Sequence, residues 1–360
     1  MKICFVLGTR PEIIKLFPLI KLCKINKIKY FIIHTGQHFD YNMEGQFLKD
    51  LNIKPNYFLN LNNKKNYNKN FFNRAVKKLI TCYAKINPDF IINQGDTNTV
   101  LASALAYKKI KKKINAKLVH IEAGIRSFDK KMPEEINRIR ADKISDILFA
   151  PTNIAKKNII NEKLNGKKIY VVGNTISDTI RENSKLWKNK KKFKEEYFFL
   201  TLHRPETVDK IKRLRVVFNT LIQISKDLNI KIIFPIHPRT KKKIKILKIK
   251  NLGQIKIIKP CNYFESLNFQ KNAKLIITDS GGMQEESCIL KKPCVTIRNN
   301  TERPETLRIN SNILTGYKSF KIKIGINKML KIKRNWKSPY GIFVSKKIIK
   351  ILKNSYKNEK

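Results

Sequence analysis

Carboxylates gather in one stretch of an otherwise basic chain. The stretch HIEAGIRSFDKKMPEEINR, residues 120–138, contains Glu122, Asp129, Glu134 and Glu135. The whole chain has 77 Lys and Arg residues against 27 Asp and Glu residues, a formal net charge of +50. A carboxylate can act as a general acid or base when burial and neighbouring charges bring its pKa towards the operating pH. A cluster of acids in such a basic chain therefore suggests a function, and acid/base chemistry is one candidate.

The acids in the second half of this stretch also have structural interpretations. Pro133, Glu134 and Glu135 are typical of a helix start, where an early proline and acids in the first turn are favourable. For Glu135 this structural role is the preferred interpretation. Asp129 is expected to be solvated, because it lies in a loop beside lysines.

Glu122 and Asp96 each follow a predicted strand. Glu122 comes directly after Leu118–Ile121, and Asp96 follows Phe90–Asn93 in the motif GDTNT. Ligands of open α/β sheets bind outside the carboxyl ends of the strands, so both carboxylates should face the same cleft. The alternative for Asp96 is a structural role as the N-cap of the small-residue helix that follows.

A glycine turn joins the first predicted strand to a helix in ICFVLGTRPEIIK. Gly8 permits a sharp turn, Thr9 can cap the helix, and Pro11 suits its first turn. Arg10 lies where a helix N-terminus favours anions, and Lys15 lies one turn further on. The pattern predicts an anion-binding turn, with an ordinary strand–turn–helix carrying surface cations as the alternative. The dinucleotide motif G-x-G-x-x-G is absent from this turn.

A second glycine turn occurs in LIITDSGGMQEES. Gly281 and Gly282 would let backbone N–H groups approach a pyrophosphate closely, and Ser280 would add a hydroxyl. Glu285 and Glu286 are predicted in the first turn of the helix, where a carboxylate could chelate the two hydroxyls of a ribose. The alternatives are a tight turn for the glycines and helix-dipole stabilisation for one of the glutamates.

The histidines follow the same pattern as the acids. Only five exist, and each lies at or just past the end of a predicted strand: His34, His38, His120, His203 and His237. Each alone is more easily explained as a structural residue. As a set they indicate one cleft at the carboxyl ends of the strands.

The elements that must position these residues alternate along the chain. Helical stretches separate most of the β-rich runs, and this predicts an α/β fold of parallel sheets with covering helices. The first series of strands is Ile3–Leu7, Tyr30–His34, Phe90–Asn93, Leu118–Ile121, Ile147–Ala150 and Ile169–Val172. The second series is Phe198–Leu202, Ile230–Pro235, Ile255–Ile258, Leu275–Thr278 and Cys294–Ile297.

Three hundred and sixty residues favour two domains. The prediction is a Rossmann-like domain over 1–177, a second over 178–340, and a C-terminal helix over 341–360 that packs back. The N-terminal apolar run is too short for a signal peptide, and no run approaches a membrane-spanning length. A cytoplasmic protein is therefore expected.

Composition excludes several other classes. Six scattered cysteines without a C-x-x-C pair suggest neither a zinc site nor a disulfide framework. Basic segments such as 188–194 and 239–250 would suit nucleic acid. The lysines are spread over the whole length, however, so solvated lysine-rich surfaces are the preferred interpretation.

Six motifs in order resemble the non-hydrolysing UDP-N-acetylglucosamine 2-epimerase family: GTRPEIIK, GDTNT, HIEAGIRS, PEEINR, DSGGMQEE and TERPET. The resemblance spans residues 1–310 and implies two Rossmann-like, doubly wound domains facing a cleft, the GT-B type of nucleotide-sugar enzymes. Such enzymes interconvert UDP-N-acetylglucosamine and UDP-N-acetylmannosamine for cell-surface polysaccharide precursors. UDP is eliminated to give an enzyme-held 2-acetamidoglucal and is added back with the opposite configuration at C2.

The resemblance also assigns roles to residues. It implies a catalytic set of Asp96, Glu122, Glu134 and His203. The carboxylates would move the C2 proton, and His203 would act on the departing phosphate or as an acid; which carboxylate takes the proton stays open. The diphosphate-binding set would be Arg10, Lys15, Ser280, Gly281, Gly282 and Arg303, and Glu286 would bind the ribose. The family implies no metal or other cofactor, and it is usually dimeric, so a homodimer is expected.

One departure from the family pattern concerns regulation. Bacterial members often carry two glutamines of an allosteric substrate site in this region, whereas here Gln37 is kept and Asp40 replaces the second one. This argues against substrate activation of the usual bacterial kind. Four alternatives stay open: an epimerase of a UDP-2,3-diacetamido-glucuronate type sugar, a hydrolysing epimerase, a GT-B glycosyltransferase, and an inactive polyanion-binding protein.

Overall fold

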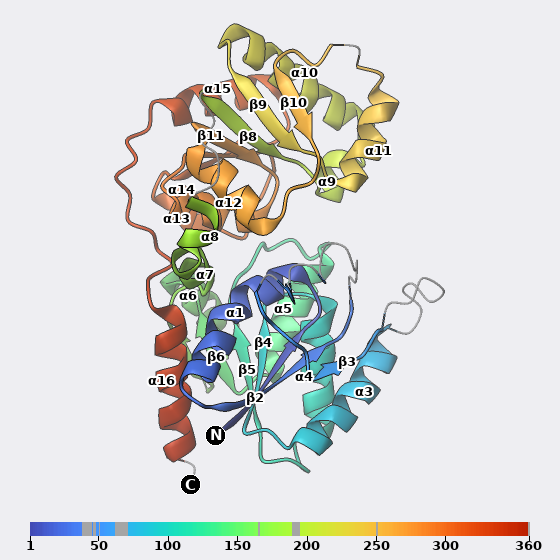
Figure 1. The fold of residues 1–360 in the computed structure, drawn as a ribbon, viewed down its shortest axis with the longest axis vertical. Coiled ribbons are helices and arrows are strands. Elements are labelled where there is room, and N and C mark those ends of the chain that lie inside the picture. The colour runs from blue at the N-terminus through green and yellow to red at the C-terminus, as the bar shows by residue number, and fades with distance from the viewer. Residues whose placement is uncertain are drawn as a thin grey trace. The chain divides into compact units, whose positions relative to one another are not determined.

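The chain folds into two compact units. The computed structural model describes all residues except 38–44, 46–47, 50, 62–70, 165, 189–194, 250 and 359–360. Unit 1 comprises Met1–Glu182 and Tyr340–Lys360, and unit 2 comprises Asn183–Pro339 (Figure 1). The predicted boundary after residue 177 would divide a helix, Ile176–Glu182, that lies within unit 1.

Unit 1 is built on a seven-stranded sheet in which every described pairing is parallel, in the order β3-β2-β1-β4-β5-β6-β7. Its strands are β1 (Lys2–Leu7), β2 (Lys29–His34), β3 (Tyr57–Phe58), β4 (Phe90–Gln94), β5 (Lys117–Ile121), β6 (Ile147–Ala150) and β7 (Lys168–Val171). Its helices are α1 (Arg10–Ile25), α3 (Phe71–Ile86), α4 (Asn98–Ile110), α5 (Pro133–Ile144), α6 (Asn153–Asn161), α7 (Ile176–Glu182) and α16 (Val344–Lys357).

Unit 2 repeats this plan with a six-stranded parallel sheet, in the order β10-β9-β8-β11-β12-β13. Its strands are β8 (Tyr197–Thr201), β9 (Lys231–Pro235), β10 (Ile255–Ile258), β11 (Leu275–Thr278), β12 (Cys294–Thr296) and β13 (Asn312–Leu314). Its helices are α8 (Ser184–Lys188), α9 (Pro205–Val208), α10 (Ile211–Asp227), α11 (Pro238–Leu247), α12 (Tyr263–Asn272), α13 (Gly281–Ile289), α14 (Pro304–Arg308) and α15 (Ser319–Leu330).

The predicted fold class is confirmed. Both sheets have the doubly wound strand order in which the first strand stands at the centre and the chain then reverses direction. Every predicted strand is present with its ends shifted by at most one residue. The sequence pattern misses β3 and β13, because two and three residues are too few to show a periodicity.

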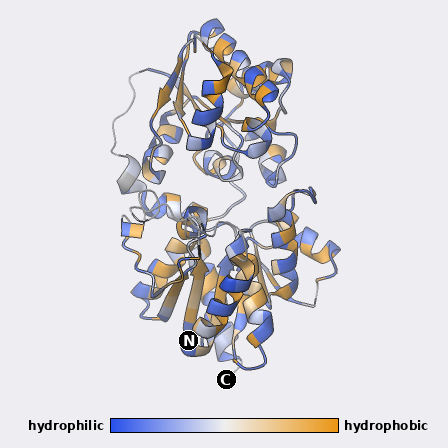
Figure 2. Ribbon diagram, turned by 90° about the vertical axis from the view of Figure 1, so that its right-hand side faces the viewer, coloured by the Kyte–Doolittle hydropathy of each residue, from blue (hydrophilic) through white to orange (hydrophobic). Residues whose placement is uncertain are grey.

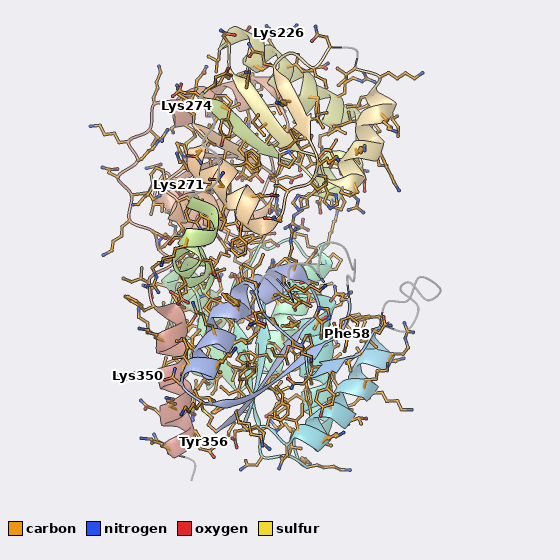
Figure 3. All side chains as sticks on the ribbon, in the orientation of Figure 1. Phe58, Lys226, Lys271, Lys274, Lys350 and Tyr356 are labelled. Atoms are coloured by element: carbon orange, nitrogen blue, oxygen red, sulfur yellow. The ribbon has the colours of Figure 1, made fainter. Side chains whose placement is uncertain are left out.

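The strands are hydrophobic because helices cover both faces of each sheet. In β4 all five residues are buried, and in β11 all four are. Continuous apolar runs of this kind are typical of parallel sheets. Figure 2 shows the hydrophobic strands of each unit surrounded by helices with hydrophilic outer faces. Lysines such as Lys226 and Lys350 are exposed on these outer faces (Figure 3).

The C-terminal helix α16 belongs to unit 1 and packs against α1 (Figure 1). The backbone N–H of Ser345 donates to the buried Asp178 carboxylate at 2.7 Å. The Arg181 guanidinium lies 4.0 Å from the centre of the Phe343 ring. No helix within the described part of the chain is both long and apolar enough to cross a membrane.

The strand order creates a switch point in each sheet, between β1 and β4 in unit 1 and between β8 and β11 in unit 2. Loops leave these adjacent strands in opposite directions, and ligands of doubly wound sheets bind there. The motifs GTRPE and GDTNT follow β1 and β4, and LHRPE and DSGG follow β8 and β11. The fold therefore places three of the six family motifs, together with His203, at the two switch points.

Candidate active-site residues in each unit

A buried glutamate joins the two loops at the switch point of unit 1. The Glu12 carboxylate accepts from the Gly8 N–H at 2.8 Å, the Thr9 hydroxyl at 2.9 Å and the Thr97 hydroxyl at 2.7 Å. Thr9 occupies the N-cap position of α1, but its side chain makes no capping bond. The predicted N-cap position is therefore confirmed, but the capping bond is not made, because the hydroxyl donates to Glu12.

Glu12 has a strongly perturbed acidity. Burial raises its pKa from 4.5 to about 7, although bonds from Thr97, Gly8 and Thr9 act in the opposite direction. Sequence reasoning missed this residue, because an acid beside Pro11 in the first turn of a helix looks like ordinary dipole stabilisation. Arg10, the predicted phosphate-binding cation, is half-buried at the first position of the same helix.

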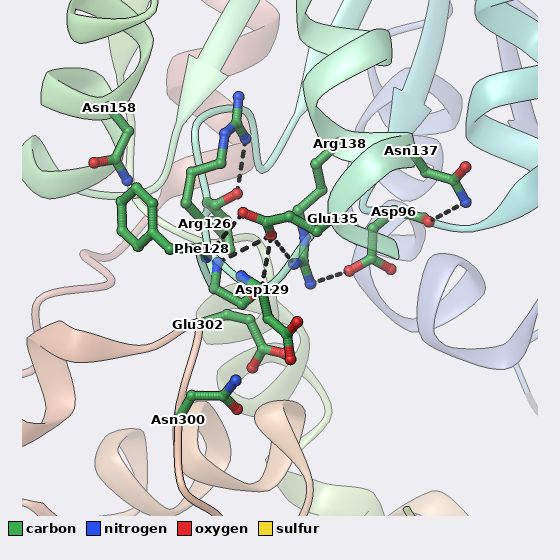
Figure 4. A network of polar contacts seen from close by, with 12 residues as sticks. Asp96, Arg126, Phe128, Asp129, Glu135, Asn137, Arg138, Asn158, Asn300 and Glu302 are labelled. Carbon is green, nitrogen blue, oxygen red and sulfur yellow. Dashed lines mark hydrogen bonds and ion pairs between the residues drawn. The ribbon is translucent and has the colours of Figure 1, made fainter. Parts of the chain in front are cut away.

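Asp96 pairs with an arginine from α5. Its carboxylate accepts a hydrogen bond from Arg138, and its backbone carbonyl accepts one from the Asn137 amide at 3.0 Å (Figure 4). The N-cap of α4 is Thr97, whose hydroxyl accepts from the Val100 N–H at 3.3 Å. The capping interpretation of Asp96 is therefore wrong. Its side chain is 30% exposed, so the carboxylate can still reach a ligand.

Glu122 is held from three sides. Its partners include the Lys15 ammonium, the Gln94 amide and the Asn174 amide, the last at 2.7 Å. The side chain is 6% exposed, and the backbone has a left-handed φ of +69° directly after β5. Such strain in a residue other than glycine persists only where the surrounding structure holds it, and it gathers at functional sites. Lys15, predicted to hold phosphate, forms an ion pair with this carboxylate.

Glu134 and Glu135 start α5 as predicted but differ in burial. Glu134 is half-buried. Glu135 is 1% exposed, and its carboxylate accepts from the N–H groups of Ser127 at 2.9 Å and Phe128 at 3.0 Å (Figure 4). It also pairs with Arg138 at 2.9 Å. Glu135 therefore does more than stabilise the helix dipole, because its hydrogen bonds connect the preceding loop to α5.

The histidines divide into two kinds. His34 and His120 are fully buried at the ends of β2 and β5. His203 and His237 follow β8 and β9, with ring centres 5.7 Å apart. His38 lies outside the described residues. The single cleft inferred from the histidine set is therefore wrong for the two buried residues, whose rings serve internal contacts.

A buried aspartate orders the loop after β8 in unit 2. The Asp279 carboxylate, at the end of β11, accepts from the N–H groups of His203 at 3.0 Å and Arg204 at 2.9 Å. The His203 Nδ1 atom lies 3.3 Å from the other carboxylate oxygen. The side chain of Asp279 is fully buried, whereas that of His203 is 38% exposed. Sequence reasoning gave Asp279 no role, because acids often end strands in turns.

The glycine pair at the start of α13 has free space around it. A Cβ atom at Gly282 would meet only the Ser280 hydroxyl, at 4.0 Å, and one at Gly281 would meet a Glu302 oxygen at 3.5 Å. Neither glycine has a positive φ. The tight-turn alternative is therefore wrong, and close approach of a ligand to the backbone explains the glycines better. Ser280 is the half-buried N-cap residue, and its side chain makes no capping bond.

Glu285 and Glu286 lie in the second turn of α13 rather than the first, so the helix-dipole alternative is wrong. Glu286, the predicted ribose ligand, accepts from the Gln270 amide at 2.6 Å. Glu285 is fully buried and pairs with Arg303. Arg303, predicted to hold the diphosphate, is therefore also part of an internal ion pair. Sequence reasoning missed Gln270, because nothing in α12 marks it.

Two features bear on the remaining expectations. Among the residues that the structure describes, no group of three or more His, Cys, Asp or Glu side chains could hold a metal ion. The side-chain oxygen of Gln37, Oε1, accepts from the Thr99 N–H at 2.8 Å and the Thr99 hydroxyl at 2.9 Å, so it supports the start of α4. Asp40, the departure from the bacterial pattern, lies outside the described residues.

The two parallel, doubly wound sheets place the protein in the class of GT-B-type folds. The chain belongs to the UDP-N-acetylglucosamine 2-epimerase family, whose sequence profile matches residues 21–353.

Individual relatives span nearly the whole chain. A UDP-N-acetylglucosamine 2-epimerase of Methanococcus maripaludis is 49% identical over 361 residues, covering 97% of each chain. The crystal structure of the Methanocaldococcus jannaschii UDP-GlcNAc 2-epimerase with UDP-GlcNAc and UDP has a TM-score of 0.90 at 44% identity, covering 98% of this chain and 100% of that one. A UDP-2,3-diacetamido-2,3-dideoxy-D-glucuronate 2-epimerase of Pseudomonas aeruginosa is 35% identical over 325 residues, covering 88% of each chain.

Proposed function

We propose that this protein is a non-hydrolysing UDP-N-acetylglucosamine 2-epimerase. It removes the C2 proton and UDP from the sugar, holds the resulting 2-acetamidoglucal, and adds UDP and a proton back with the opposite configuration at C2. The product is UDP-N-acetylmannosamine, and the reaction is reversible. Membership of the family and the relatives at 45% and 49% identity support this substrate.

The environment of Glu122 is the observation that carries the proposal. Epimerisation at C2 needs an acid/base group in a fixed position, because misplacing it by a small distance costs much of the rate. Glu122 is nearly fully buried, in a strained backbone conformation, and held by Lys15, Gln94 and Asn174. The left-handed backbone distinguishes Glu122 from Glu135 and Asp279, the buried carboxylates that hold loops.

Asp96 and Glu134 supply the other carboxylates of unit 1 to the reaction. Asp96 is kept in place by Arg138 and stays partly exposed, and Glu134 is half-buried at the start of α5. Together with Glu122 they provide proton donors and acceptors for the two faces of C2. Arg10, at the first position of α1, adds positive charge for the phosphates.

Unit 2 holds the UDP part of the substrate. The N–H groups of Gly281 and Gly282 at the start of α13 suit a diphosphate, and Ser280 adds a hydroxyl. His203 stands at the neighbouring loop and acts on the phosphate as it departs. Glu286 binds the ribose hydroxyls, oriented by Gln270.

Proton NMR with UDP-N-acetylglucosamine in D2O tests the function. We expect UDP-N-acetylmannosamine that carries deuterium at C2. Free N-acetylmannosamine with UDP would instead indicate a hydrolysing enzyme. Turnover only of UDP-2,3-diacetamido-2,3-dideoxy-glucuronate would indicate the specificity of the Pseudomonas aeruginosa relative. No turnover of either sugar would refute the proposal.

The expected homodimer stays a prediction. Light scattering on a size-exclusion column measures the mass directly. We expect twice the chain mass of 42.2 kDa, and a single-chain mass at working concentration would contradict it.

A further inference from the structure

The Asp142 carboxylate contacts residues that precede and follow Glu122 in the chain. This aspartate lies on α5 and is fully buried. One carboxylate oxygen lies 2.6 Å from the Nδ1 atom of His120. The other accepts from the Gly124 N–H at 3.0 Å and the Arg126 guanidinium at 2.6 Å. Residues 120, 124 and 126 bracket Glu122, so one carboxylate fixes the loop before and after it.

The second nitrogen of His120 reaches the other catalytic loop. Its Nε2 atom lies 2.8 Å from the Gly95 carbonyl oxygen, next to Asp96 in the chain. A carbonyl oxygen can only accept, so Nε2 carries a proton. The fully buried ring thus connects the loop of Glu122 with the loop of Asp96.

The charges around the ring balance when His120 is a cation. Asp142 also receives a bond from Arg126, which in turn binds the Glu162 carboxylate at 2.7 Å and 2.9 Å. Two cations, His120 and Arg126, therefore face two anions, Asp142 and Glu162. Burial alone would lower the pKa of His120, but Asp142 and the Gly95 carbonyl raise it above its ordinary value. Burial alone would raise the pKa of Asp142, but His120 and Arg126 hold it below its ordinary value.

The backbone that follows β5, residues 122–124, has little conformational freedom. Gly124 has a φ of +78°, and a Cβ atom there would lie 2.1 Å from the Ala155 carbonyl oxygen. Glu122 itself has a φ of +69° without being glycine. The contacts of Asp142 before and after Glu122 therefore help to hold its backbone in this conformation.

We propose that the buried His120–Asp142 ion pair is a positioning device that sets the Asp96 loop against the Glu122 loop for proton transfer. Helix α5 reinforces the arrangement, because Arg138 on the same helix pairs with the Asp96 carboxylate. The inference rests on the proposed function, since it concerns the position of the groups that move the C2 proton. His120 and Asp142 act through Gly95, Gly124 and Arg126, and their role is positional.

The test compares Asp142→Asn with Glu162→Gln. Asp142→Asn keeps the shape of the side chain but removes the partner charge of His120. We expect kcat for UDP-N-acetylglucosamine to fall by roughly 30- to 100-fold, while KM and the dissociation constant for UDP change by less than about threefold. Glu162→Gln removes the other carboxylate of the cluster and weakens its bonds to Arg126. It leaves the contacts of Asp142 with His120 and the Gly124 N–H in place, so its kcat should stay within about threefold of the wild type.

The pH profile separates positioning from general stability. Without the Asp142 charge, the buried His120 ring should lose a proton at a lower pH than in the wild type. A neutral ring has one N–H group, so it cannot donate both to residue 142 and to the Gly95 carbonyl. The ratio of the variant kcat to the wild-type kcat should therefore fall as pH rises from about 5.5 to 7.5. A folded Asp142→Asn enzyme with wild-type kcat, equal losses in both variants, or a ratio independent of pH would each overturn the inference.

If Asp142→Asn does not fold, the protonation state of His120 in the wild type still tests the inference. NMR of protein labelled with ¹⁵N-histidine should show one buried ring whose two nitrogens stay protonated at pH values where an ordinary histidine is neutral, which supports the ion pair. A neutral ring for His120 would overturn the inference. An inactive wild-type enzyme would refute the proposed function and this inference with it, whereas an active wild type with an unaffected variant refutes only the inference.

Discussion

The switch points of the two sheets are built alike and differ in what they present. In each, one buried carboxylate ties the loops of the two central strands together. Glu12 joins Gly8 and Thr9 to Thr97 in unit 1. Asp279 joins β11 to the loop that follows β8 in unit 2. The same strand order is thus accompanied by a buried carboxylate that connects the two central loops in both units.

The two switch points differ in the polar groups that surround the buried carboxylate. Unit 1 adds further carboxylates, Asp96 and Glu122, each paired with a cation on a neighbouring element. Unit 2 adds backbone N–H groups at the start of α13, next to two glycines with room for a ligand. In the proposed mechanism, the same order of strands therefore supports proton transfer in unit 1 and anion binding in unit 2.

The largest effect is expected from removing the acid/base group of unit 1. Glu122→Gln keeps the size of the side chain and can still bond to Asn174, but it cannot take or give a proton. We expect kcat to fall by about 10³-fold or more, measured as conversion of UDP-N-acetylglucosamine by NMR. Activity within about tenfold of the wild type would show that another group moves the C2 proton.

A smaller effect is expected from loosening the loop of unit 2. In Asp279→Asn the N–H groups of His203 and Arg204 lose a carboxylate acceptor. We expect kcat/KM to fall by about 10- to 100-fold, the effect of one charged hydrogen bond. The control is Thr201→Val, which removes a 2.7 Å bond to Thr278 on the same two strands and should change kcat/KM by less than about threefold. Equal losses in both variants would mean that only sheet stability matters.

Adding one methyl group should reveal the ligand at α13. Gly282→Ala fits the free protein without a clash and should leave its stability unchanged or slightly higher. If the diphosphate approaches this backbone, KM for the UDP sugar should rise by about tenfold. Gly166 provides the control, because a Cβ atom added there would have nothing within 4 Å, and Gly166→Ala should change neither quantity. An unchanged KM in Gly282→Ala would place the phosphates elsewhere.

The last prediction concerns the stability of the fold around Glu12 rather than activity. The pKa of Glu12 is raised from 4.5 to about 7 in the folded protein, so its contribution to the free energy of unfolding is full below pH 4.5 and is lost as pH rises to about 7. Glu12→Gln removes this dependence. As pH rises from 5 to 8, the wild type loses this contribution and the variant does not. The free energy of unfolding of the variant minus that of the wild type should therefore increase by at most about 3 kcal/mol. Urea unfolding at both pH values measures the change, and a constant difference would contradict the assignment.

The sequence predicts the fold well because continuous apolar runs and helical spacing are local signals. Every long strand is found from them, and only β3 and β13 are missed. The positions of Asp96 and Glu122 at strand ends also follow from local patterns. Gly281 and Gly282 are predicted in the turn before the helix, whereas they are the first two residues of α13.

The pairings between distant residues could not be predicted in this way. Lys15 meets Glu122 across 107 positions of the chain, and His203 meets Asp279 across 76. Such contacts depend on the strand order, which the local pattern does not give. Glu135 was undervalued for the same reason, since its role depends on a loop that folds back onto α5.

The most direct test of the division between the units is calorimetric titration of UDP into the wild type, Glu122→Gln and Gly282→Ala. If unit 1 supplies the chemistry and unit 2 holds the nucleotide, the dissociation constant of Glu122→Gln should match the wild type within about twofold, and that of Gly282→Ala should be about tenfold higher. Loss of UDP binding in Glu122→Gln together with unchanged binding in Gly282→Ala would contradict the account.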